Sequence, residues 1–333
     1  MKVFLGVVAF LAAACGVGTV IPQGEAPVTY LEHYGTITGL LLIRSGLTDV
    51  YHAWWFVAAE GWLVLSTAAC TWRRVRALPQ PYRLDRRNAA RTGLVLAHLG
   101  VLLILVTLTL RPYTHREAYV AVAEGAVANL SRLGYAFDLH VRRFTIDLYP
   151  DGTPRRYVSS VEVRENGRIV RRAQIAVNHP LRHRGVKVYQ FDWGWLVQGT
   201  VRRGRAVRSF DLRSGDAVSL QDGTTLRLHF YPDFTLDAAG MPATRSLAPR
   251  RPRVFYVLEG NGRPLTMGLA APGEGVSLPD GLLVIDGYRY FTGLEVKREP
   301  TLPATFAGFV LAAAGLGLYY GLHLTRPGTG REA

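Results

Sequence analysis

Hydrophobic residues gather in four long stretches, and about 190 residues with a strand-like pattern separate the third stretch from the fourth. The stretches are Val3–Ile21, Trp54–Trp72, Thr92–Leu110 and Leu302–Leu324. A helix needs about 20 mostly apolar residues to cross the hydrocarbon core of a bilayer, and each stretch has about this length. The pattern predicts a membrane protein with four transmembrane α-helices, at about residues 3–21, 54–72, 92–110 and 302–324.

The intervening segment, residues 112–299, carries the period of β-strands. Apolar and polar side chains alternate over residues 137–141, as a strand with one buried face requires. Asn166 and Asn261 are each followed by glycine and lie between alternating runs. Such pairs favour β-hairpins because the turn needs positive φ angles. We therefore expect a large all-β, sandwich-like domain between the third and fourth helices.

The placement of charge predicts how the chain crosses the membrane. The net charge is +14, and the loop between the second and third helices has seven arginines against one aspartate, a net +6. These residues are Arg73, Arg74, Arg76, Arg83, Arg86, Arg87, Arg91 and Asp85. Short arginine-rich loops stay in the cytoplasm, so the charge indicates membrane topology rather than a nucleic-acid partner. Both termini, including the tail within residues 300–333, are then cytoplasmic, and residues 112–299 are extracytoplasmic.

The two cysteines, Cys15 and Cys70, both lie inside predicted helices, and the β domain has none. The domain is therefore not held by disulfides, and the simplest role of both thiols is apolar packing. Leu11–Cys15 faintly resembles a lipoprotein cleavage box, but the apolar run continues to Ile21. We expect an uncleaved first helix.

Ionisable groups inside the apolar stretches are the candidates for chemistry, because burying them in hydrocarbon is costly. His98 lies six residues into the third stretch, in the half of the membrane nearer the cytoplasm. A neutral imidazole is a natural axial ligand of haem iron, but helix packing and proton relay remain open for it. His52 lies at the outer edge of the second helix, where a structural role is common. Glu60 lies deeper in the same helix, and its role is open.

No motif predicts a self-contained enzyme. His179 and His183 flank Pro180, which interrupts a helix through them, so we expect no metal site there. The sequence has no G-x-S-x-G, no Walker loop and no G-x-G-x-x-G between a strand and a helix. Catalytic residues stay unassigned.

Several segments, in this order along the chain, are similar to motifs of the ResB (also called CcsB) family of cytochrome c biogenesis proteins. These segments are Ile21-Pro22-Gln23, Leu47–Phe56, Ala97–Leu103, Asn178–Leu181 with Gly185 and Tyr189-Gln190, and Tyr290–Arg298. The resemblance covers essentially the whole chain. One departure is Glu299-Pro300-Thr301, where the family pattern leads us to expect Asp-Pro-Gly.

The resemblance implies a role in system II cytochrome c maturation in the bacterial cytoplasmic (inner) membrane. Proteins of this kind work with a ResC/CcsA-type membrane partner that carries a Trp-rich haem-handling motif. The pair moves haem b outward and attaches it to CxxCH apocytochromes c. His98 would then be a haem axial ligand shared with the partner, and His52 a second candidate. The chain would be a non-autonomous subunit of a cytochrome c haem lyase.

Two other functions remain compatible with the sequence. The chain is either a structural or chaperone subunit that never binds haem but holds apocytochrome or braces the partner, or a sensor or transporter with a ligand pocket in its β domain. In the first case His98 makes only a hydrogen bond between helices.

Overall fold

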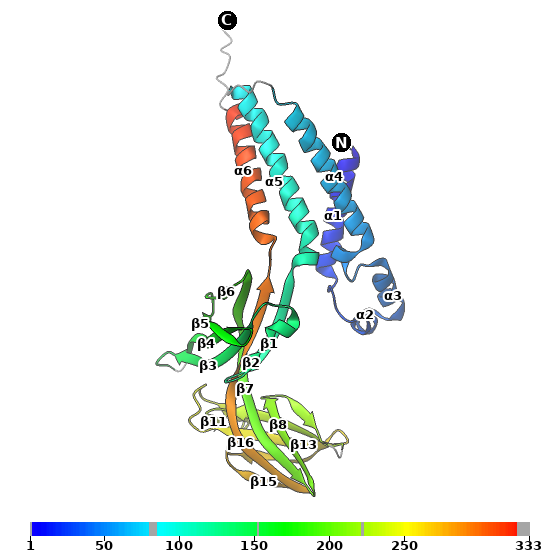
Figure 1. Ribbon diagram of the computed structural model, residues 1–333. Coiled ribbons are helices and arrows are strands. Elements are labelled where there is room, and N and C mark those ends of the chain that lie inside the picture. The colour runs from blue at the N-terminus through cyan, green and yellow to red at the C-terminus, as the bar shows by residue number, and fades with distance from the viewer. Residues whose placement is uncertain (1, 80–84, 152, 221–222, 325–333) are drawn as a thin grey trace. The chain divides into compact units, whose positions relative to one another are not determined.

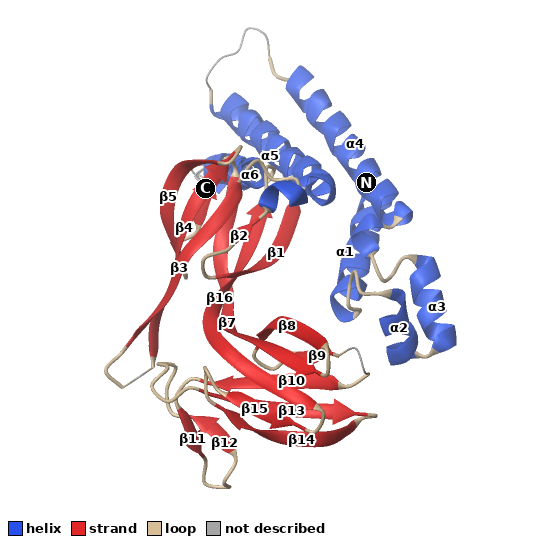
Figure 2. Cartoon of the chain, turned by 60° about the horizontal axis from the view of Figure 1, so that its bottom comes forward, coloured by secondary structure: helices blue, strands red, loops and turns tan. Residues whose placement is uncertain are grey.

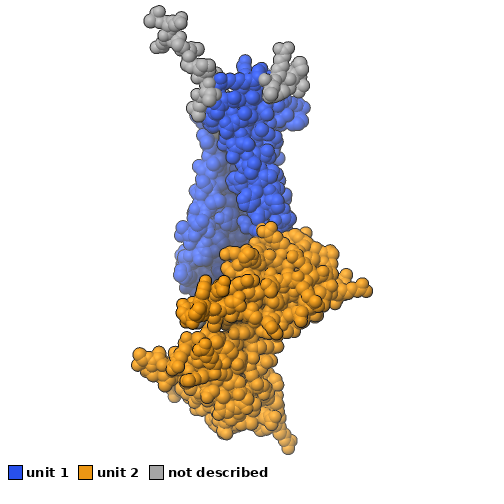
Figure 3. Space-filling model, turned by 90° about the vertical axis from the view of Figure 1, so that its left-hand side faces the viewer, with its two compact units in different colours: residues 1–115, 299–333 blue, residues 116–298 orange. Residues whose placement is uncertain are grey.

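The chain divides into two compact units, which Figure 3 colours separately. The computed structural model describes residues 2–79, 85–151, 153–220 and 223–324, with side chains as far as residue 322. The first unit comprises residues 1–115 and 299–333, and the second comprises residues 116–298. Arg83, Arg326 and Arg331, which enter the predicted topology, lie outside the described residues.

The first unit is entirely helical among its described residues (Figures 1 and 2). Its elements are α1 (Lys2–Val20), α2 (Pro27–Tyr34), α3 (Thr36–Ser45), the 3₁₀ turn η1 (Val50–His52), α4 (Trp54–Arg76), α5 (Arg86–Thr114) and α6 (Leu302–Leu324). Within the part of the chain that the structure describes, four helical segments are long and apolar enough to cross a membrane: Lys2–Val20, Thr36–Arg76, Arg86–Thr114 and Leu302–Leu322.

The helix positions differ from those that the hydrophobic stretches predict, most of all at the arginine-rich ends. The first helix is shifted by one residue. Helix α4 continues four residues beyond Trp72, and α5 begins at Arg86 rather than Thr92 and ends at Thr114 rather than Leu110. Arginine is a good helix former. In addition, Asp85 caps α5 by accepting a 2.7 Å hydrogen bond from the backbone N–H of Asn88. Hydropathy locates the apolar core of a helix but not these polar end turns.

Helices α5 and α6 pack backbone to backbone through glycines. A Cβ atom on Gly100 would lie 2.4 Å from the nitrogen of Ala312, and one on Gly315 would lie 2.4 Å from the nitrogen of Ala97. Small residues allow this close approach, which favours the association of helices in membranes. The hydroxyl of Thr305 also donates a 2.9 Å hydrogen bond to that of Thr107. The two helices therefore form a closely packed pair.

The described residues of the second unit form sixteen strands, and Figure 2 shows this unit in red. They are β1 (Arg116–Ala123), β2 (Val127–Ala128), β3 (Asp138–Leu148), β4 (Pro154–Glu165), β5 (Arg168–Ala176), β6 (Leu181–His183), β7 (Val186–Arg203), β8 (Ala206–Arg213), β9 (Ala217–Ser219), β10 (Thr225–Tyr231), β11 (Phe234–Leu236), β12 (Pro242–Thr244), β13 (Arg253–Gly260), β14 (Arg263–Ala270), β15 (Gly275–Leu278) and β16 (Gly281–Arg298), with the 3₁₀ turn η2 (Leu130–Leu133). The predicted β-rich region between the third and fourth long helices is confirmed.

Two long antiparallel strands, β7 and β16, run through both hydrophobic cores of this unit. At one end of the ribbon, Val188 and Leu294 join a core with the sheet β2-β3-β4-β5. At the other end, Val197 and Ile285 join a core with the sheet β14-β13-β10-β9. Each strand has 18 residues, about 60 Å at the rise of an extended chain. One ribbon thus serves two sandwich-like lobes.

The two predicted Asn-Gly hairpins are confirmed. Asn166 lies in the turn between β4 and β5 with φ of 48°, and Asn261 lies in the turn between β13 and β14 with φ of 52°. Asparagine tolerates this left-handed region better than most residues, and the glycine that follows adopts it at little cost.

Candidate functional site

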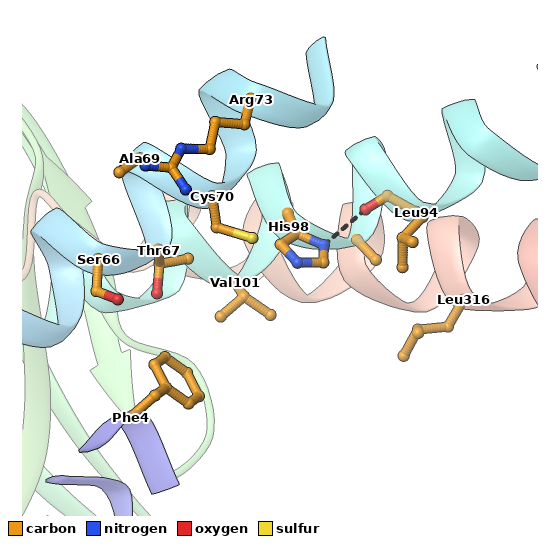
Figure 4. A pocket seen from close by; sticks show the side chains of 11 residues that line it. Phe4, Ser66, Thr67, Ala69, Cys70, Arg73, Leu94, His98, Val101 and Leu316 are labelled. Carbon is orange, nitrogen blue, oxygen red and sulfur yellow. Dashed lines mark hydrogen bonds between the residues drawn. The ribbon is translucent and has the colours of Figure 1, made fainter. Parts of the chain in front are cut away.

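His98 lines a cavity of about 660 Å³ within the helical unit. We call this space the His98 cavity, and Figure 4 shows it. Its lining residues are Phe4, Ser66, Thr67, Ala69, Cys70, Arg73, Leu94, Ala97, His98, Val101 and Leu316, from helices α1, α4, α5 and α6. The volume lies within the range of about 300–1,000 Å³ that small-molecule and cofactor sites occupy. Mostly apolar walls with a few polar groups are typical of such sites.

A hydrogen bond fixes the tautomer of the neutral, half-buried His98 ring. Its Nδ1 lies 2.8 Å from the carbonyl oxygen of Leu94, one turn earlier in α5 (Figure 4). A carbonyl oxygen only accepts hydrogen bonds, so Nδ1 carries the proton. In the neutral ring Nε2 then keeps its lone pair, and Figure 4 shows this nitrogen directed away from Leu94 into the cavity. Metal-ligating histidines commonly donate their other N–H to a carbonyl in this way.

His52 lies in a different cavity, of about 520 Å³, which we call the His52 cavity. It is lined by Cys15, Tyr51, His52, Phe56, Glu60, Leu108, Arg111, Pro112 and His115. The two candidate ligands are therefore not brought together. The His52 side chain is 52% exposed, and its Nδ1 lies 2.7 Å from Oδ1 of Asp49. This imidazole is more open to its surroundings than that of His98.

The groups whose roles the sequence left open fall in one or the other cavity. Cys70 lines the His98 cavity, whereas Cys15 and Glu60 line the His52 cavity. Glu299, part of the departure from the family pattern, lies 3.7 Å from the Arg111 guanidinium. This ion pair joins the end of α5 to the start of α6.

In the β unit, His183, one of the two histidines near Pro180, contacts a carboxylate. Nε2 of His183 lies 2.8 Å from Oε1 of Glu165, a carboxylate that Arg184 also binds. Within the described parts of the chain, no cluster of three or more His, Cys, Asp and Glu side chains has a geometry that could hold a metal ion. Trp193 and Trp195 pack in the core that contains β10 and β13, so they are structural residues.

A buried carboxylate organises a basic cluster on β3, β4 and β5. Glu162 is 4% exposed and lies 3.2 Å from the His140 ring and from the Arg172 guanidinium, and 3.3 Å from that of Arg164. Its neighbours, the His140 imidazole first, lower the pKa of Glu162 to about 2, although desolvation acts in the opposite direction. Residues 116–298 hold 27 basic and 18 acidic side chains, a net +9.

Sequence reasoning missed most of the His98 cavity. Ser66, Cys70 and Arg73 follow the spacing of one helix face, and this periodicity was the available signal. Nothing in the sequence indicated that this face of α4 lies across from His98 on α5. The Glu162 cluster was also missed, because its members come together only through strand register.

The chain belongs to the ResB-like family, whose family model matches residues 1–90 and 85–262. Among similar proteins, cytochrome c biogenesis protein CcsB of Synechococcus sp. (strain CC9902) is 26% identical over 390 residues, covering 96% of this chain and 86% of the relative. The protein of the same name from Gloeobacter violaceus is 26% identical over 392 residues, covering 97% of this chain and 82% of the relative.

Among solved structures, the chain is similar to one titled cytochrome c heme lyase CcmF, with a TM-score of 0.34 and 11% identity. The match covers 95% of this chain but only 39% of that protein. A score this low does not establish a common fold.

Proposed function

We propose that this chain acts in cytochrome c biogenesis as a subunit of the system II cytochrome c synthase. It works with a ResC/CcsA-type membrane partner, carries haem b across the bacterial cytoplasmic membrane, and supports its attachment to CxxCH apocytochrome c. Membership of the ResB-like family and the names of the relatives support the general role. The chain alone is a non-autonomous part of a haem lyase.

The haem proposal rests on the tautomer of His98, which leaves one ring nitrogen without a proton. Its Nδ1–H is committed to the carbonyl of Leu94, so Nε2 is free to ligate iron. The cavity beside it is large enough for a cofactor and mostly apolar, which suits the body of a porphyrin. The residues present therefore fit haem: His98 would ligate the iron from this chain, and the partner would supply a further ligand. The chemistry of attachment belongs to the haem vinyl groups and the cysteine thiols of the substrate.

The proposed orientation follows from the arginines between α4 and α5. Arg73, Arg74, Arg76, Arg86 and Arg87 are described at the facing ends of these helices, and short loops rich in arginine stay in the cytoplasm. The His98 cavity, which Arg73 also lines, then belongs to the cytoplasmic half of the membrane, where newly made haem enters. The β unit lies outside, where apocytochrome c is found.

The test is the haem content of the complex purified with its partner from membranes. We expect a Soret band in the wild type that His98→Ala abolishes or shifts, and that added imidazole restores. His33→Ala is the matched control, because it removes an imidazole from α2 that lines neither cavity. His52→Ala shows whether the second cavity contributes.

The alternatives make different predictions. If no haem copurifies with any form of the complex, or if His98→Ala leaves the spectrum unchanged, the structural or chaperone subunit replaces the haem-binding one. A deletion strain with normal c-type cytochromes would contradict both and favour a sensor or transporter.

A further inference from the structure

An arginine lines the His98 cavity together with the candidate ligand. Arg73 comes three residues after Cys70 and seven after Ser66 on α4, so all three lie along one face, and all three line the cavity. Side chains on a helix tilt toward its N-terminus. Accordingly, the Arg73 guanidinium lies back beside Ala69 and Cys70 rather than beyond the end of the helix (Figure 4).

Arg73 differs from Arg76 and Arg86, whose guanidinium groups make contacts with other groups of the chain. Arg76, one turn later on α4, places its guanidinium 4.6 Å from the centre of the Trp72 ring. Arg86, at the start of α5, donates to the carbonyl oxygen of Leu322. Among the described residues, Arg73 has no hydrogen-bond or ion-pair partner for its side chain. Its guanidinium is therefore available to a ligand in the cavity.

The chemistry of the cavity specifies the class of ligand. A guanidinium presents paired N–H donors that match the two oxygens of a carboxylate. Phe4, Leu94 and Val101 give the cavity an apolar wall, which suits a ligand with an apolar body. The site thus suits an apolar molecule with an anionic group at one edge.

We propose that Arg73 binds a propionate carboxylate of the haem whose iron His98 ligates. This inference rests on the proposed function and adds an orientation to it. The propionates and the vinyl groups of haem lie toward opposite edges of the ring. Anchoring the propionate edge at Arg73 directs the vinyl edge away from this end of α4, so the edge that later reacts with thiols is placed by an ion pair. Arg73 is a positioning residue in this scheme.

The experiment compares haem with haem dimethyl ester, in which both propionates are uncharged. The full-length chain is reconstituted in phosphatidylcholine nanodiscs, and each ligand is titrated by difference absorption. The variants are Arg73→Gln and the matched control Arg76→Gln, which removes an arginine one turn away that does not line the cavity. His98→Ala reports whether the Soret signal depends on the iron ligand.

We expect Arg73→Gln to raise the dissociation constant for haem about 10- to 100-fold, as for a hydrogen bond to a charged group. The constant for the dimethyl ester should be unchanged by this substitution, which also shows that the variant is folded. In the wild type, haem should bind more tightly than the ester by the same factor, and Arg76→Gln should alter neither.

Other outcomes overturn the proposal, and they separate its failure from that of the proposed function. A His98-dependent signal with equal affinity for haem and ester would refute the role of Arg73 while leaving haem ligation intact. A signal independent of His98 would refute the proposed function itself. Replacing part of the phosphatidylcholine by phosphatidylglycerol tests whether Arg73 binds a lipid phosphate. If the anionic lipid weakens the binding of haem and of its ester equally, and only when Arg73 is present, Arg73 binds a lipid headgroup instead of a propionate.

Discussion

The glycine contact between α5 and α6 gives the most direct test of how the helical unit is held together. In Gly315→Ala, the new Cβ would lie 2.4 Å from the nitrogen of Ala97 and 2.5 Å from the carbonyl oxygen of Gly93. Ordinary van der Waals contact begins at 3.4 Å, so the helices must separate by about 1 Å. Both atoms belong to backbone and cannot move aside as a side chain would. Overpacking of this kind costs about 1–3 kcal/mol.

Gly317→Ala is the control for Gly315→Ala, because a Cβ at Gly317, two residues later in the same helix, would meet nothing within 4 Å. Replacing a mid-helix glycine by alanine without a clash stabilises by about 0.5–1 kcal/mol. The two variants should therefore shift the free energy of unfolding in opposite directions.

The assay is equilibrium unfolding of the full chain in mixed micelles, followed by helical circular dichroism. A second readout is haem affinity, because Ala97 precedes His98 and a displaced α5 would move the imidazole. If Gly315→Ala proves as stable as Gly317→Ala, the close approach of the two backbones is wrong, and with it the view that α6 holds α5 in place.

Two further predictions each test one contact, the first in the helical unit and the second in the β unit. Thr305→Val should cost about 0.6 kcal/mol of unfolding free energy, and a double-mutant cycle with Thr107→Val should show coupling; strict additivity would mean that the hydroxyls do not interact. The depressed pKa of Glu162 stabilises the β unit fully above about pH 4.5, the ordinary range of a glutamate, and this contribution is lost as the pH falls toward 2. Glu162→Gln should remove this part of the acid sensitivity, measured by hydrogen exchange of β4; an unchanged pH profile would contradict the assignment.

The sequence was most informative where one local pattern determines one element. Four apolar stretches located the long helices, and glycine after Asn166 and Asn261 located two hairpins, because bilayer length and turn geometry are local requirements. The ends of the helices were less accessible. Hydropathy falls where arginines begin, but backbone hydrogen bonds and the Asp85 cap carry the helix further.

The β unit shows what local patterns cannot specify. Alternation indicated strands, but the double role of the β7–β16 ribbon depends on pairing between residues about 100 positions apart. The bulges near Gly287 and Gly293 shift the register along this ribbon, and a shift of one residue exchanges the buried and exposed faces of a strand. Which residues share a core is therefore a property of the assembled sheets.

The candidate site on α5 depends both on a local sequence pattern and on tertiary packing. His98 could be singled out because an imidazole inside an apolar run is unusual, which is a local signal. The surroundings that give it a chemical role come from two different neighbours. Gly93 and Gly100 on α5 are held against the backbone of α6, while Leu94, His98 and Val101, which lie about 100–160° further round the helix, face the cavity with α4. The close contact on one side fixes the height of the imidazole, and the open space on the other side admits a ligand. A sequence indicates each of these faces as a set of small or apolar residues, but only the packing of α5 between its neighbours separates the face that is closed from the face that binds.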